Sequence, residues 1–178
     1  VWNHQWRAHG SQPGYGVKQS SQFLISKSTD DGLTWSEPRN ITRQVKKEKW
    51  WLLAPGPGRG ITMEDGTLVF PVEGRNEDGL QLSTIMWSKE KGGSWTVGEP
   101  AYYNTNECQV VELSDHSLML NMRERSNRGR QEGNGRAIAV TADLGKTWTE
   151  HPTSRRALIE PACQASLLRH DYIEDGEE

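Results

Sequence analysis

The sequence predicts an all-β protein built from consecutive blades of a β-propeller. The pattern Ser-x-Asp-x-Gly-x-Thr-Trp occurs at residues 28–35, returns with Thr in place of Ser at 141–148, and has a degenerate copy at 88–95. The copies start at residues 28, 88 and 141, and are therefore 60 and 53 residues apart. This period fits one blade of four short strands. The 178 residues accommodate about three such blades.

The repeated pattern has the chemistry of a turn that holds itself together. Its short carboxylate can accept N–H groups across a tight loop, and its glycine can take a positive φ. Its hydroxyl groups can bond within the loop, while the closing tryptophan can pack between neighbouring sheets. We therefore expect the three copies, called Asp-boxes below, to be structural turns that do not touch a substrate.

Short runs rich in apolar and β-branched residues lie between the Asp-boxes and are bounded by turn-forming residues. We expect these runs to be strands, at residues 22–27, 67–70, 83–87, 117–122 and 137–140. Residues 63–67, which contain an Asp-Gly pair, and residues 114–117 are expected to be hairpin turns. Helical periodicity is nearly absent, so the pattern predicts a series of antiparallel hairpins.

Composition and charge narrow the class of protein. Apolar residues make up 33% of the chain and mean hydropathy is -0.81, but 8 Trp and 18 Gly are not typical of a disordered segment. A net charge of -3 provides no basic field for nucleic acid. Cys108 and Cys163 form no disulfide framework and no CxxC metal motif. No apolar run approaches the roughly 18 residues of a membrane span, so we expect no span. The sequence suggests no metal site, and we expect neither a metal nor a cofactor.

Two strand-like segments carry charged residues that interrupt an apolar pattern. Glu107 stands at the head of one segment, and Arg123 stands at the tail of the next. With a turn near residues 114–117, an antiparallel hairpin would bring the two side chains to the same rim of a blade. Such a pair could be part of a functional site, or it could be a structural ion pair, which contributes only about 0 to 1 kcal/mol when exposed.

The remaining charged residues are expected to lie at the surface. A polar stretch rich in Gly and Asn contains several arginines, which we interpret as a solvated loop: Arg125, Arg128, Arg130 and Arg136. Other carboxylates fall in turn-like contexts, among them Glu64, Asp65, Glu77 and Asp78.

An ordered set of motifs resembles the exo-α-sialidases, or neuraminidases, which are six-bladed Asp-box propellers. The set consists of Thr-Asn-Glu107-Cys-Gln-Val, then Leu-Asn-Met-Arg123, then the Asp-box at 141–148, then Glu-Pro-Ala-Cys-Gln164-Ala-Ser-Leu. The match runs from about residue 20 to residue 170 and is strongest to the bacterial enzymes. It implies that residues 1–178 are part of one sialidase catalytic domain.

This resemblance implies that the protein hydrolyses terminal sialic acids from glycoproteins, glycolipids or oligosaccharides with retention. Three arginines of the family clamp the sugar carboxylate, and Arg123 matches the middle one; a planar guanidinium can bind a carboxylate through two parallel bonds. The family nucleophile is a tyrosine, which needs an adjacent base because a phenol with a pKa near 10 is weakly nucleophilic. Glu107 matches that base, and Gln164 matches a polar contact to the sugar. A secreted, periplasmic or lysosomal location is favoured.

The resemblance leaves part of the site unaccounted for. The first arginine and the acid/base aspartate of the family lie upstream of the first Asp-box, and residues 1–27 contain neither motif. The third arginine and the nucleophilic tyrosine lie beyond the segment matching residues 168–170. Tyr102, Tyr103 and Tyr172 do not stand in the tyrosine motif. We expect the chain to hold about half a site and to need the remainder of the propeller.

Two other functions fit parts of the same pattern. A non-catalytic propeller for glycan binding or scaffolding would need the Asp-boxes but neither Glu107 nor Arg123. An Asp-box glycosidase acting on neutral polysaccharide would need a pair of Asp residues and an aromatic cleft. Four tryptophans could stack on sugars, but such residues more often pack between blades: Trp2, Trp6, Trp50 and Trp51.

Overall fold

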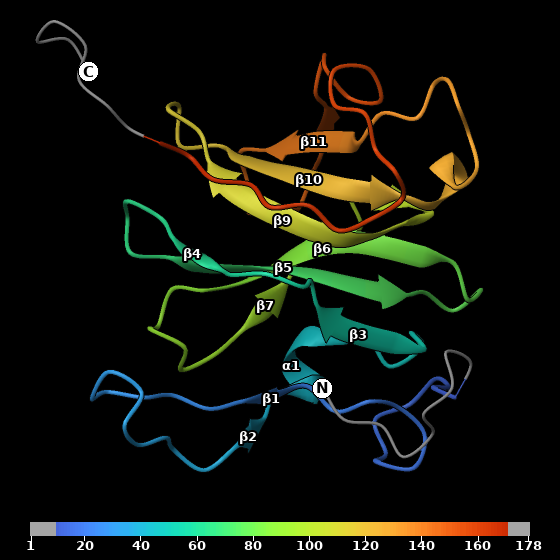
Figure 1. Cartoon of the computed structure of the whole chain (residues 1–178). Coiled ribbons are helices and arrows are strands. Elements are labelled where there is room, and N and C mark those ends of the chain that lie inside the picture. Colours follow the sequence, from blue (N-terminus) through green and yellow to red (C-terminus); the bar gives the residue numbers. More distant parts are fainter. Residues whose placement is uncertain (1–9, 171–178) are drawn as a thin grey trace, which may run out of the picture.

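Three antiparallel sheets follow one another along the chain in the computed structural model, which describes residues 10–170 (Figure 1). The first sheet pairs β1 (Leu24–Ile25) with β2 (Arg39–Asn40), and a single helical turn follows, α1 (Thr42–Val45). The second sheet has the order β3 (Leu52–Pro55), β5 (Leu68–Arg75), β6 (Gln81–Ser88) and β7 (Thr96–Val97). Two short strands extend it, β4 (Ile61–Thr62) beside β5 and β8 (Tyr102–Tyr103) beside β6.

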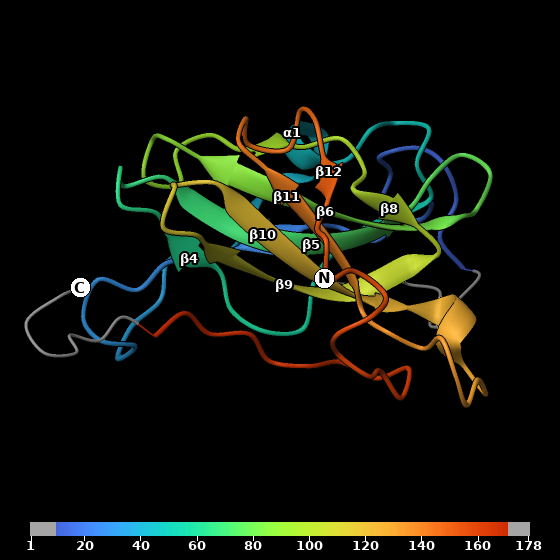
Figure 2. The same cartoon turned by 90° about the horizontal axis from the view of Figure 1, so that it is seen from above.

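The third sheet contains the hairpin that carries Glu107 and Arg123. Its order is β12 (Thr149–Glu150), β11 (Ala137–Thr141), β10 (Leu118–Glu124) and β9 (Thr105–Glu112). A 3-10 turn, η1 (Arg125–Asn127), follows β10. The sheets lie side by side in chain order, from blue to orange in Figure 1. Figure 2 shows β4 at one end of the sheets and the orange loop after β10 at the other.

The all-β prediction is confirmed, and most predicted strands are parts of longer ones. Residues 67–70, 83–87, 117–122 and 137–140 overlap β5, β6, β10 and β11. In the predicted strand at 22–27, Leu24 and Ile25 form β1 and Gln22 forms an isolated bridge, while the residues after Ile25 lead into the first Asp-box. Both predicted hairpin turns are present: Met63 N–H donates to Thr67 O, and Leu113 N–H donates to Ser117 O, each at 2.8 Å.

The three Asp-box segments fold into the same self-bonded loop. In the first, Asp30 accepts the Thr34 N–H at 2.9 Å and the Thr34 hydroxyl at 2.6 Å. Asp143 accepts the corresponding pair from Thr147 at 2.9 and 2.7 Å. In the degenerate copy, the Ser94 hydroxyl donates to the Glu90 carboxylate at 3.0 Å. The loop therefore uses the polar groups of its acidic residue internally, which keeps the hairpin closed.

The closing tryptophan of an Asp-box packs onto the sheet that precedes it. Trp95 is buried between the first and second sheets, and Trp148 donates its indole N–H to Glu99 O of the preceding sheet at 2.9 Å. The prediction of packing between sheets is wrong for Trp35, which is 65% exposed. Trp35 belongs to the first sheet, and residues 10–170 contain no earlier sheet against which its ring could pack.

Two apolar clusters join the sheets, and the second sheet contributes to both. Val72 and Met86 point toward the first sheet, where they join Phe23, Ile41 and Val45. Val69 on β5 and Ile85 on β6 point the other way. They join a cluster with five residues of the third sheet, Cys108, Val110, Leu118, Leu120 and Met122. Successive side chains of a strand alternate between faces, so β5 and β6 bury apolar residues on both. This packing holds the third sheet in place.

Replacing a side chain of the second cluster should destabilise the fold much more than replacing an exposed leucine. Leu120 is fully buried, and Leu120→Ala is expected to lower the free energy of unfolding by about 2–5 kcal/mol. The control is Leu33→Ala, at a side chain that is 85% exposed, for which a change within about 0.5 kcal/mol is expected. Urea unfolding followed by tryptophan fluorescence measures both values. Similar changes for the two variants would contradict the assignment of this cluster.

The third Asp-box should make stability depend on pH at the acid end. Hydrogen bonds from the Thr147 N–H, the Thr147 hydroxyl and the Thr141 hydroxyl lower the pKa of Asp143 from 3.8 to about 2. Because the folded pKa is depressed, this stabilisation is complete above pH 3.8 and is lost as pH falls toward 2. Asp143→Asn is expected to flatten the fall in melting temperature across that interval. Glu132→Gln, in the exposed loop before β11, is the control and should leave the slope unchanged.

Candidate active site

Glu107 and Arg123 meet where β9 begins and β10 ends, as the hairpin pattern predicts. Arg123 Nη1 lies 3.1 Å from Glu107 Oε2, and the two side chains are 23% and 30% exposed. The hairpin turn lies at the opposite end of both strands, so antiparallel pairing places the two residues together. The pair is a partly exposed ion pair, and it is accessible to a solute.

A β-bulge sets the direction of Glu107. Along the β9–β10 ladder Met122 pairs with Cys108, but Arg123 pairs with Asn106. Glu107 is therefore the extra residue on β9, with no direct partner on β10. A bulge bends its strand and aims a side chain away from the regular alternation of faces. In a regular ladder continued from the Met122–Cys108 pair, Glu107 would be the cross-strand partner of Arg123.

The peptide group at the bulge is bonded by two side chains of the second sheet. Glu107 N–H donates to Glu73 Oε2 at 2.9 Å, and the Ser83 hydroxyl donates to Asn106 O at 2.9 Å. Sequence reasoning missed Glu73. The signal that could have found it is the same one that identified Glu107, because Glu73 is a carboxylate inside the apolar strand Leu68–Arg75.

Electrostatics at Glu73 are those of a half-buried carboxylate beside a second one. Burial raises the pKa of Glu73 above its usual value, and the negative charge of Glu107 adds to the rise. The N–H group of Glu107 and the guanidinium groups of Arg123 and Arg75 oppose it. Burial also raises the pKa of the Cys108 thiol, so Cys108 is a packing residue rather than a reactive one.

Arg136 is buried, which corrects the prediction that it belongs to a solvated loop. Its side chain is 4% exposed; Nε donates to the Asn121 side-chain oxygen and Nη1 donates to Cys163 O at 3.0 Å. Burial lowers the pKa of Arg136, and the charges of Glu160 and Glu107 oppose this. Arg136 immediately precedes β11, so it faces the sheet rather than the loop. The loop prediction is confirmed for three exposed residues, Arg125, Arg128 and Arg130.

Glu160 ties the C-terminal described segment to the end of β10. Its side chain is fully buried, and Oε2 accepts the Glu124 N–H at 2.7 Å and the Asn127 side-chain amide at 2.9 Å. Glu124 follows Arg123 directly in sequence. Glu160 thus holds the backbone that follows Arg123, and Arg136 bonds the side chain of Asn121, two residues before it.

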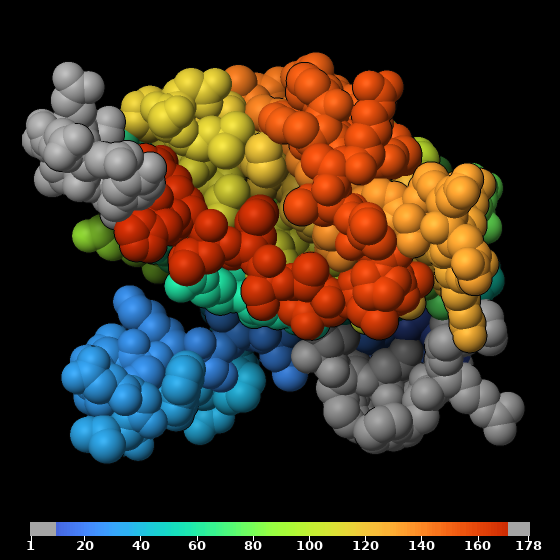
Figure 3. Space-filling view, turned by 45° about the horizontal axis from the view of Figure 1, so that its top comes forward, coloured from blue at the N-terminus to red at the C-terminus, as the bar shows by residue number. Residues whose placement is uncertain are grey.

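Gln164 lies on the same segment, which crosses the surface in red in Figure 3. Its side-chain amide donates to Pro57 O at 2.9 Å, and the amide of Gln109 donates to the same oxygen. Residue 58 has φ +145, and a Cβ there would overlap the Gln109 amide, so the loop needs glycine at this position. Gln164 is thus hydrogen-bonded to Pro57 in the loop at residues 55–60, and not to Glu107 or Arg123.

Aromatic residues near the site have structural partners. Trp50 is buried in the first apolar cluster, and the indole N–H of Trp51 donates to Glu77 O at 2.9 Å. The Arg155 guanidinium lies 4.6 Å from the centre of the Tyr102 ring, and burial raises the pKa of that tyrosine. Three residues considered in the sequence, Trp2, Trp6 and Tyr172, lie outside the described residues.

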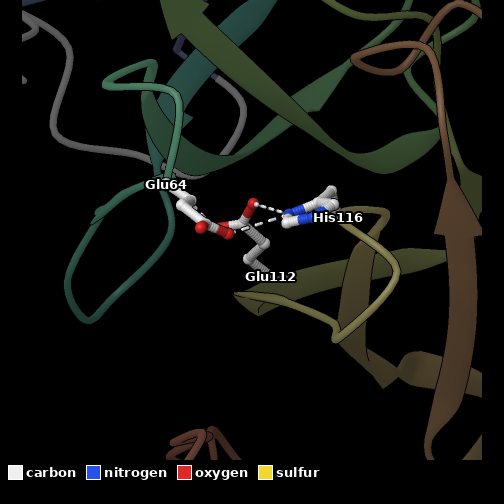
Figure 4. Close-up of side chains that lie close together, drawn as sticks. All are labelled: Glu64, Glu112 and His116. Carbon is white, nitrogen blue, oxygen red and sulfur yellow. Dashed lines mark hydrogen bonds and ion pairs between the residues drawn. The ribbon is translucent and has the colours of Figure 1, made fainter.

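A second polar cluster lies at the opposite end of the strands (Figure 4). His116 Nδ1 is 3.1 Å from Glu64 Oε2 and 3.4 Å from Glu112 Oε1, and Glu64 N–H donates to Glu112 at 2.9 Å. Among residues 10–170, Glu64, Glu112 and His116 are the group that could hold a metal ion, because their ligand atoms all lie within 4.8 Å of one another. The same contacts join two hairpin tips beside a hollow of about 730 Å³. The expectation of no metal stays a prediction.

Comparisons with known proteins cover nearly the whole chain. A model of the BNR repeat-like domain matches residues 3–177. A sialidase from Bacteroides fragilis is 50% identical over 163 residues, which are 92% of this chain and 28% of that protein. A sialidase from Clostridium perfringens is 33% identical over 180 residues, covering 92% of this chain and 45% of that protein. The chain thus spans less than half the length of these relatives.

Solved structures give the same result. The Hadza microbial sialidase Hz136 superimposes with a TM-score of 0.82 at 42% identity, covering 92% of this chain and 32% of that one. The intramolecular trans-sialidase from Ruminococcus gnavus, in complex with oseltamivir carboxylate, gives a TM-score of 0.58 at 29% identity, covering 72% and 26%. In residues 10–170, no helix has the length and apolar character that crossing a membrane requires.

Proposed function

The chain belongs to the sialidase family with BNR repeats, and from this premise we propose that it supplies part of the active site of a retaining exo-α-sialidase. The substrate would be a terminal sialic acid on a glycoprotein, glycolipid or oligosaccharide. The observation that supports this most directly is the accessible contact of 3.1 Å between Arg123 and Glu107 on a bulged strand.

Arg123 is the proposed ligand of the substrate carboxylate. Sialic acid carries a permanent carboxylate on its anomeric carbon, and a guanidinium offers several N–H donors in one plane. In the free site Arg123 Nη1 contacts Glu107, but its side chain keeps 23% of its surface exposed. A substrate carboxylate can therefore approach the guanidinium without first breaking a buried ion pair. The buried Glu160 carboxylate accepts the N–H of Glu124, the residue that follows Arg123.

Glu107 is the proposed base for a tyrosine nucleophile supplied by another part of the propeller. The phenol O–H bond breaks, its proton passes to the Glu107 carboxylate, and the phenolate oxygen forms a bond to the anomeric carbon. The glycosidic oxygen leaves with a proton from the acid residue, and water later displaces the tyrosine, so configuration is retained. A neutral phenol can approach an anomeric centre that bears a carboxylate, whereas a carboxylate nucleophile would be repelled.

Gln164 is the proposed polar contact to the sugar. Its side chain is exposed, and one amide hydrogen bonds to Pro57 O, which leaves a second N–H and the carbonyl oxygen to bind hydroxyl groups. The shared bond to Pro57 O places Gln164 beside Gln109 of β9, the strand that carries Glu107.

In the full-length gene product, Arg123→Ala should abolish most sialidase activity. Loss of a charge-assisted partner of the substrate carboxylate is expected to lower kcat/KM about 100-fold or more on a fluorogenic sialoside. Glu107→Gln should lower kcat more than KM, since it removes the base and keeps the shape of the side chain. Arg128→Ala, in the exposed loop after η1, is the matched control and should retain full activity. Equal activity of all variants would contradict these two assignments, whereas absence of activity in the unsubstituted full-length product would favour a non-catalytic glycan-binding propeller.

The 178-residue chain by itself should not hydrolyse a sialoside, because the proposed nucleophile, the acid residue and two arginines would come from the remainder of the propeller. The measurement is turnover of a fluorogenic sialoside by the purified chain, beside the full-length product at equal concentration. Circular dichroism verifies that the purified chain contains β-structure. Turnover by the chain would show that the site is complete within it.

A further inference from the structure

We propose that Glu73 and Ser83 are positioning residues that hold the bulged peptide between Asn106 and Glu107 and thereby aim the Glu107 carboxylate at its reaction partner. This inference rests on the proposed function of Glu107. It goes beyond it by assigning a role to two residues of the second sheet, neither of which need contact the substrate.

The bulge creates the need for such support. Backbone N–H and C=O groups that lie inside a protein require partners, and an extra residue interrupts the regular ladder that would provide them. At this bulge the N–H of Glu107 donates to Glu73 and the C=O of Asn106 accepts from Ser83, each at 2.9 Å. Both polar groups of a single peptide unit therefore have side-chain partners on the second sheet.

The two supporting side chains form one unit. Glu73 on β5 and Ser83 on β6 are direct cross-strand partners, so their side chains stand next to each other on the same face of the second sheet. Ser83 is fully buried and Glu73 is half-buried. Since β5 and β6 are fixed by apolar clusters on both faces, the pair is a rigid support for the neighbouring sheet.

Glu73 also contributes charge. The charged and titratable groups that face it are Arg75 on its own strand, Glu107 and Cys108 on β9, and Arg123 on β10. A charged acceptor makes the stronger hydrogen bond, so the Glu73 carboxylate holds the Glu107 N–H more firmly than a neutral side chain would.

Two substitutions separate the hydrogen bond from the charge. Glu73→Gln keeps an oxygen that can accept the Glu107 N–H, and it removes the charge. It is expected to keep kcat within about threefold, because the amide oxygen still accepts the N–H. Glu73→Ala removes both, and a misplaced base is expected to lower kcat about tenfold to 100-fold, with KM changed much less. Ser83→Ala should lower kcat in the same direction by a smaller factor.

Glu64→Gln is the matched control, because it neutralises an exposed carboxylate at the opposite end of the strands. Its activity should equal that of the original protein. Melting temperatures verify that each variant is folded. If Glu73→Ala does not fold, Ser83→Ala decides, and an unchanged kcat in that variant would overturn the proposal.

A measurement without substrate distinguishes this proposal from the proposed function. Amide hydrogen exchange, read by NMR, should be about tenfold faster at Glu107 in Glu73→Ala, since the N–H loses its acceptor. Faster exchange in a protein that has no sialidase activity would support the positioning role and refute the enzymatic one. Unchanged exchange, together with unchanged kcat in an active protein, would overturn the positioning role alone.

Discussion

Burial of both faces of the second sheet is the constraint on which the rest of the structure depends. Strands β5 and β6 alternate apolar residues toward the first and third sheets, so neither face can be left in water without exposing large side chains. Stacking three sheets in chain order satisfies this requirement. The Asp-box tryptophans Trp95 and Trp148 then close the outer part of each boundary.

The same boundary between the second and third sheets positions the polar residues of the candidate site. Glu73 and Ser83 reach across it to the peptide at Glu107, over sequence separations of 34 and 23 residues. Arg136 and Glu160 act on the other side of the hairpin, where they bond Cys163 O and the Glu124 N–H. The Arg123–Glu107 contact is therefore supported from both sides, although its own free energy as a partly exposed pair is small, about 0 to 1 kcal/mol.

The two ends of the strands have different chemistry. At one end lie the Asp-boxes and the contacts among Glu64, Glu112 and His116, which close hairpins or join their tips. At the other end lie Glu107, Arg123 and the bulge, where charged side chains stay partly exposed beside the half-buried Glu73. Because the two ends share no side chains, the stability of the hairpin loops can change without changing the chemistry at Glu107 and Arg123.

The sequence by itself determined the features that depend on near neighbours. A repeated eight-residue turn predicted the hairpins, and a hairpin turn between two strands was sufficient to bring Glu107 and Arg123 together, because antiparallel pairing is local. Only the tertiary structure decided that Glu73 supports Glu107, that the strand bulges there, and that Arg136 is buried. These features arise from contacts between sheets, and the partner of Arg136 at Cys163 is 27 residues away. No periodicity within one strand encodes which distant side chain will satisfy an unpaired peptide group, since that depends on how whole sheets pack.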